Sequence, residues 1–111
     1  MSYERELLKG STDSLLLSLI SHQPMYGYKI IKELEKRSKG YFQFKEGTLY
    51  PALHRLEKAG LVQGKWQRLP SGPERRYYHI TAKGQKALAE RLTVWQGFST
   101  AVALIIQPLN G

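Results

Sequence analysis

The chain contains no cysteine and a single aspartate, Asp13. Without cysteine it can form no disulfide, no thiol nucleophile and no thiolate metal site. The three histidines are scattered, and none shares a metal-binding spacing with a carboxylate. A glycine-rich phosphate loop and a nucleophile elbow are also missing. We therefore expect no catalysis, no cofactor and no metal site.

A membrane-spanning segment is absent from the sequence as well. No apolar run approaches the roughly 18 residues that a transmembrane helix needs, and the N-terminus has no signal-peptide core. We expect no membrane partner and a cytoplasmic location. A length of 111 residues predicts one small unit with a modest core.

Acidic residues are few, and the net charge is +8. Residues 29–79 carry twelve lysines and arginines against five acidic residues, so most of the net charge lies in the middle of the chain. We interpret this segment as a surface that faces a polyanion, and the nearly neutral ends as a separate interaction surface. A generally basic, solvated surface is the alternative, which the localisation of the charge disfavours.

Hydrophobic periodicity and turn residues predict the order helix, helix, helix, strand, strand, helix. This order is typical of a mainly α (α+β) winged helix-turn-helix, with residues 1–81 as the DNA-binding domain and 82–111 as a C-terminal dimerisation helix. Leu7 and Leu8 can extend the first helix backwards. The predicted elements are helices over 11–21, 26–38 and from 46 to a stop at 60, strands over 61–69 and 74–81, and a helix over 82–107.

The third predicted helix has one apolar and one basic side. Helical spacing brings Leu49, Ala52, Leu53 and Leu56 together, and places Pro51, His54, Arg55 and Lys58 opposite them. The planar fork of Arg55 suits a bidentate contact to guanine, Lys58 suits phosphate, and His54 suits either. A solvated helix face with local ion pairs is the alternative reading of this side.

The start of the same helix offers further DNA-binding groups. Gly47 and Thr48 can hold a phosphate with backbone N–H groups and a hydroxyl. Tyr50 lies at the edge of the apolar side, so its ring is expected to pack while its hydroxyl reaches DNA.

The predicted hairpin would form the wing. Its strands carry four cations, two before and two after a Pro-Ser-Gly-Pro turn, namely Lys65, Arg68, Arg75 and Arg76. Because phosphate contacts supply much of the affinity for DNA and make it salt-sensitive, we expect these cations to contact the backbone. Tyr77 and Tyr78 must point to opposite faces of their strand, so one of them should pack in the core.

The last predicted helix carries more apolar surface than one small domain covers. A heptad seam runs along Leu88, Leu92, Trp95, Ser99, Val102, Ile106 and Leu109, and a second row consists of Val94, Phe98, Ala101 and Ile105. We expect a homodimer, with a helix that folds back over its own domain as the alternative. Trp95 either forms an aromatic dimer core, which we favour, or stacks on a planar ligand.

The chain closely resembles the PadR family of bacterial transcriptional regulators over about residues 7–92. The resemblance is carried by LLKGSTDSLLLSLI, MYGYKIIKEL, EGTLYPALHRLEKAGLV, GPERRYYHIT and AKGQKAL. It implies a winged helix-turn-helix dimer held by the C-terminal helix that binds palindromic promoter sites, usually as a repressor. Some members are released by phenolic acids or planar drugs.

Carried over by position, the resemblance implies specific DNA contacts. In the third helix they are Thr48, Tyr50, Pro51, His54 and Arg55, and in the wing they are Ser71, Gly72 and Arg75. The short C-terminal helix is similar to that of the compact branch of the family. In a drug-binding member of that branch, the tryptophan that matches Trp95 lines a pore between the subunits.

Three functional hypotheses follow from these observations. The leading one is a homodimeric repressor that binds double-stranded DNA at an inverted repeat. The third predicted helix of each subunit would then lie about one DNA turn from that of the other subunit. The second is an adaptor that uses the winged fold to bind a protein. The third, compatible with the first, is a repressor that senses a small planar aromatic effector at Leu88, Leu92, Trp95, Phe98, Val102 and Ile106 of the dimer interface.

Overall fold

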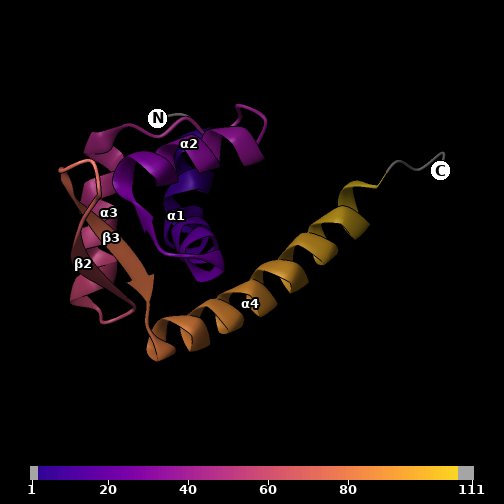
Figure 1. Cartoon of the computed structure of the whole chain (residues 1–111). Helices are drawn as coiled ribbons and strands as arrows, with labels where there is room; N and C mark the ends of the chain where they lie inside the picture. Colours follow the sequence, from indigo (N-terminus) through magenta and orange to yellow (C-terminus); the bar gives the residue numbers. More distant parts are fainter. Residues whose placement is uncertain (1–2, 108–111) are drawn as a thin grey trace.

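The computed structural model describes the backbone of residues 3–107 and the side chains of residues 10–107. It is a mixed α+β fold in which a small antiparallel sheet packs beside a helical cluster, which confirms the predicted fold class (Figure 1). The elements are α1 (Tyr3–His22), β1 (Met25–Tyr26), α2 (Gly27–Arg37), α3 (Glu46–Lys58), β2 (Val62–Arg68), β3 (Glu74–Ile80) and α4 (Ala82–Ile106).

The three-stranded sheet has the order β1-β3-β2. In β1, Met25 pairs with Tyr78, and in β2, Val62 pairs with Ile80. The predicted second helix wrongly included Tyr26, because a strand of two residues is too short to show the alternation that marks a strand in sequence. The hairpin of β2 and β3 was predicted within one residue at each inner end.

The core lies between α1, α2, α3 and the inner face of the sheet. The apolar side of α3 is fully buried as predicted, each of its residues being at most 1% exposed: Leu49, Ala52, Leu53 and Leu56. Tyr78 is buried in the same core, whereas Tyr77 packs edge-to-face on Tyr26, with ring centroids 5.4 Å apart. The two tyrosines therefore divide between the faces of β3 as expected.

Helix α4 begins at a side-chain cap. The Gly84 N–H donates to Thr81 Oγ1 at 3.0 Å, and the Thr81 hydroxyl donates to the carbonyl of Gly60 at 2.6 Å. Close packing continues at Gly84, where an added Cβ would lie 2.0 Å from the carbonyl oxygen of Leu61. The start of α4 is thus fixed to the end of α3 and the root of the hairpin.

Beyond its first turns, α4 runs away from the rest of the chain as an arm (Figure 1). The radius of gyration is 16.1 Å, against about 13 Å for a compact chain of this length. Leu88, predicted on the dimer seam, is instead buried in the core of its own chain, because the first turns of α4 pack on α1. The first turns of the predicted 82–111 segment thus belong to the winged-helix core, and Leu109 lies outside the described residues.

Among residues 3–107, no helix combines the length and the apolar character that crossing a bilayer requires.

Candidate nucleic-acid interface

The side of α3 that faces away from the core is exposed along its whole length. Gly47, Pro51, His54 and Lys58 form the middle of this side, since they are separated by three or four residues. The helix ends where Gly60 adopts a φ of +79°, which confirms the predicted stop. An exposed helix face of this kind has the dimensions to enter the major groove of DNA.

Arg55 lies at the edge of this exposed side that is nearer to α1. Its Nη2 is 3.5 Å from Asp13 Oδ1, and its side chain is 60% exposed. The other carboxylate oxygen, Oδ2, is 3.7 Å from Arg91 Nη1 of α4. Asp13 therefore links the predicted base-reading arginine to both α1 and α4, a contact that no sequence pattern indicated.

Tyr50 lies at the opposite edge of α3 and packs over the start of α2. A Cβ added to Gly27 would lie 2.2 Å from the Tyr50 hydroxyl oxygen, so only glycine fits beneath this phenol. The ring therefore packs as predicted, and the residue stays 44% exposed. Thr48 is exposed at the N-terminal end of α3, as its predicted phosphate contact requires.

The four cations of the hairpin differ in their surroundings. Lys65 and Arg68 are exposed, while the Arg75 guanidinium lies 4.3 Å from the ring centroid of Tyr26. Arg76, in contrast, forms an ion pair with Glu57 of α3. At the tip of the hairpin Ser71 and Gly72 are exposed, and Gly72 has a φ of +112°, which favours glycine.

A cleft of about 500 Å³ separates α3 from the hairpin. Burial raises the pKa of the Tyr78 phenol at its floor, against the opposing effect of the nearby Arg76 charge. The lining residues are Tyr50, Pro51, His54, Glu57, Arg76 and Tyr78. Three of them are predicted α3 contacts, so this cleft and the exposed side of α3 form one continuous candidate interface.

A second hollow, of about 510 Å³, lies between α1 and α4. Trp95 and Phe98 form its aromatic part, with ring centroids 6.1 Å apart, and Arg91 supplies a cation. Its remaining lining comes from Gly10, Ser14, Glu90 and Val94. Trp95 is 52% exposed here, so the chain by itself leaves a face of the indole open.

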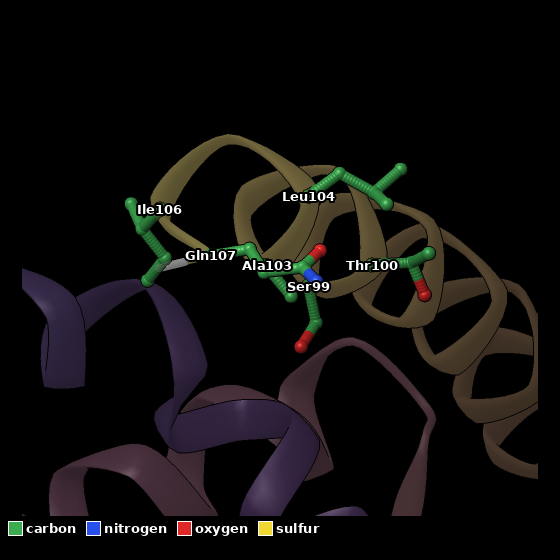
Figure 2. Close-up of a pocket in the computed structure, with 6 residues that line it drawn as sticks. All are labelled: Ser99, Thr100, Ala103, Leu104, Ile106 and Gln107. Carbon is green, nitrogen blue, oxygen red and sulfur yellow. The ribbon is translucent and has the colours of Figure 1, made fainter. Parts of the chain in front are cut away.

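The outer turns of α4 carry a third hollow, shown in Figure 2. All of its lining residues lie on or directly after α4, so a single helix forms its wall: Ser99, Thr100, Ala103, Leu104, Ile106 and Gln107. Leu92 and Phe98 are exposed on the same helix and Val102 is half-buried. The outer turns of α4 run away from α3, as the arm in Figure 1 shows.

The sequence did not predict two ion pairs of the interface, Asp13 with Arg55 and Glu57 with Arg76, or the exposure of Trp66. The acids at 13 and 57 are separated from their partners by 42 and 19 residues. Local charge patterning cannot reveal such pairs. Trp66 is 64% exposed on β2 and is absent from the predicted contacts, because an aromatic residue in a strand pattern indicates only strand preference.

Comparison with known proteins shows one consistent family. The family described as "Transcriptional regulator PadR-like family" matches residues 16–90. The transcriptional regulator Rv3488 of Mycobacterium tuberculosis is 34% identical over 86 residues, which are 78% of this chain and 77% of that protein.

Solved structures agree with this match. The crystal structure of a PadR-like transcriptional regulator from Bacillus cereus is 36% identical, with a TM-score of 0.83 over 93% of this chain and 98% of that one. A transcriptional regulator from Clostridium thermocellum has the same TM-score at 28% identity, over 92% and 99% of the two chains. The similarity covers the winged helix and most of α4.

Proposed function

The chain belongs to the PadR-like family of transcriptional regulators, and we propose that it is a homodimeric repressor that binds an inverted repeat in promoter DNA. The resemblance predicted from the sequence motifs is thereby confirmed, as is the expectation that the protein is not an enzyme. The observation that carries the proposal is the continuous exposed face formed by α3 and the cationic hairpin. Promoter DNA lies in the cytoplasm of a bacterium, where such a repressor would act.

In this proposal α3 reads bases and the hairpin holds the backbone. Pro51 and His54 meet base edges at the centre of α3, and Arg55 reaches guanine from the edge nearer α1. Thr48, Tyr50 and Lys58 contact phosphates that flank the groove. The hairpin neutralises further phosphates through Lys65, Arg68 and Arg75, while Ser71 and Gly72 contact the backbone at its tip.

The dimer of this proposal forms along the arm of α4. Val94, Phe98 and Ile105 share one side of the helix and are 71%, 58% and 83% exposed, and Ile106 on the adjoining seam is 73% exposed. Isolated exposed apolar residues are ordinary, but a row that continues over several turns is typical of an interface. A second copy of α4 covers this row and makes the site two-fold symmetric, which an inverted repeat requires.

A dimer of this kind predicts a measurable change of assembly. Replacing Ile106 with glutamate should convert the dimer to a monomer in sedimentation experiments, because a charge in the apolar seam is left without a partner. Thr100→Glu adds the same charge on another side of α4 and serves as a control for charge alone. A dimer that survives Ile106→Glu unchanged would contradict the assignment of the interface.

The proposal also includes a small effector that binds at Trp95. The exposed indole, the Phe98 ring and the Arg91 cation suit a flat aromatic compound. Flat compounds should quench the tryptophan emission, and the quenching should be lost in Trp95→Phe. Quenching that survives this change arises from Trp66, and Trp95 is then part of an aromatic dimer core.

Selection of bound duplexes from random DNA tests the central proposal. We expect enrichment of an inverted repeat whose half-sites are separated by about one helical turn. Enrichment of a single half-site would contradict the symmetric dimer. If no sequence is enriched and binding does not weaken with salt, the adaptor hypothesis replaces the repressor.

A further inference from the structure

Glu57 places a negative charge between α3 and the hairpin, on the face that the proposed function assigns to DNA. Its Oε2 accepts a hydrogen bond from the Gly64 N–H at 3.1 Å and a second one from Nη2 of Arg76. Gly64 lies on β2 and Arg76 on β3, so one carboxylate oxygen joins α3 to both strands of the wing. Neither side chain is fully exposed, with 33% of Arg76 and 30% of Glu57 accessible.

The sheet shapes a seat for the Arg76 guanidinium. Gly64 is opposite Tyr78 and Trp66 is opposite Arg76, so all four lie on one face of the hairpin. A Cβ on Gly64 would lie 2.3 Å from Arg76 Nε, which means that the guanidinium crosses directly over the glycine. The rings of Trp66 and Tyr78 are each centred 5.9 Å from Arg76 Cζ.

We propose that Glu57 and Arg76 form a brace that fixes the hairpin at one angle to α3, with Gly64 as the position that makes room for it. Arg76 is then a positioning residue rather than a phosphate contact, which revises its predicted role. The proposal rests on the DNA-binding function, because the angle matters only if α3 and the hairpin contact one ligand together.

The position of the brace explains how it acts on the other wing residues. Lys65 follows Gly64 on β2, and Arg75 precedes Arg76 on β3. Fixing Gly64 and Arg76 therefore fixes the backbone from which both neighbouring cations project. Preorganised groups bind with less loss of conformational entropy, so a fixed hairpin raises affinity without adding a contact.

Electrostatic repulsion and the brace predict opposite changes in DNA affinity when the charge of Glu57 is removed. An acid near a phosphate backbone lowers affinity, so removal of its charge alone should strengthen binding to every duplex. The brace predicts the opposite for Glu57→Gln, because the neutral amide loses the charge-assisted bond to Arg76 and the hairpin is released. Glu74→Gln is the matched control, since Glu74 is an exposed acid on the same hairpin.

The experiment compares the wild type, Glu57→Gln and Glu74→Gln in titrations with the selected operator at several salt concentrations. We expect Glu57→Gln to weaken binding about tenfold and to make the salt slope shallower by about one, as wing phosphates are lost. Glu74→Gln should bind as tightly as the wild type or slightly tighter. If Glu57→Gln also binds as tightly or tighter, the brace is refuted while the repressor stands.

Arg76→Lys separates positioning from charge. If Arg76 held a phosphate, the retained charge would preserve most of the affinity, because lysine also binds phosphate as a point charge. The brace predicts a loss similar to that of Glu57→Gln, since an ammonium cannot lie flat over Gly64 between two rings. A wild type that shows no operator binding refutes the proposed function itself, whatever these variants do.

A spectroscopic signal reports the brace without DNA. In a Trp95→Phe background the emission comes from Trp66, beside which the guanidinium lies. Glu57→Gln should shift this emission and Glu74→Gln should leave it unchanged. Identical spectra for the two variants would show that Glu57 does not hold Arg76 in its seat.

Discussion

Arg55 and Asp13 allow a sharp test of which group reads a base. Arg55→Ala should weaken binding to the operator much more than binding to random duplexes, because a guanidinium that contacts guanine contributes only at the correct base. Asp13→Asn should strengthen operator binding, because it removes the carboxylate that lies 3.5 Å from Arg55 in the free protein. The two changes therefore alter the affinity for the operator in opposite directions through the same guanidinium.

The expected magnitudes follow from the exposure of the pair. With side chains 60% and 32% exposed, the ion pair contributes about 0.2 to 1 kcal/mol, and Asp13→Asn should raise affinity about 1.5- to 5-fold. A bidentate contact from arginine to guanine is worth about 1 to 3 kcal/mol, so Arg55→Ala should cost about 5- to 150-fold. The base contact outweighs the ion pair, so Asp13 moderates Arg55 without disabling it.

Fluorescence anisotropy with the selected operator and a scrambled duplex measures both effects. Lys58→Ala is the control, and as a phosphate contact it should lose affinity for the two duplexes equally. The gain from Asp13→Asn should disappear in the double variant with Arg55→Ala, because its target is then gone. Equal losses on both duplexes for Arg55→Ala would refute the base-reading role, and a gain that persists in the double variant would make Asp13 a general repulsive charge.

Three further predictions concern the wing and the core. Lys65→Ala should weaken binding to all duplexes and make the salt slope shallower by about one, and an unchanged slope would remove Lys65 from the interface. Gly84→Ala should lower the free energy of unfolding by about 1 to 3 kcal/mol, because its Cβ would meet the carbonyl of Leu61, whereas Gly47→Ala, with open space around it, should not. Burial raises the pKa of Tyr78 above its ordinary 10.0, so stability present below pH 10 should be lost as the pH rises further. Tyr78→Phe should remove that part of the pH dependence, and an unchanged profile would contradict the assignment.

The elements that sequence predicts best are those with strong local signals. The apolar spacing of α3, the stop at Gly60 and the start of α4 at residue 82 all depend on residues within a few positions of one another. Each was predicted close to its observed place. The choice of exposed residues on α3 follows from the same periodicity, which is why most of the candidate contacts lie on one surface.

The features that sequence did not reveal depend on contacts between distant segments. Strand β1 exists because Met25 and Tyr26 meet β3 across more than fifty residues. Leu88 fits a heptad as well as its neighbours do, and only the packing of α4 on α1 shows that it belongs to the core. The roles of Asp13 and Glu57 also come from tertiary pairing. The positions of Arg55 and Arg76 in the sequence do not show that each forms an ion pair with one of these acids.

These pairings also join surfaces that the sequence suggested were separate. Among residues 10–107, Asp13 is the side chain that forms ion pairs with both α3 and α4, through Arg55 and Arg91. Arg91 also lines the hollow that contains Trp95. In the proposed repressor, a bound anion or aromatic group that drew Arg91 away would leave Asp13 to pair with Arg55 alone and would strengthen an ion pair that competes with DNA. Because an exposed ion pair is weak, this effect would change affinity only a few-fold, and a larger response would require a shift of α4 that changes the spacing of the two α3 helices in the proposed dimer.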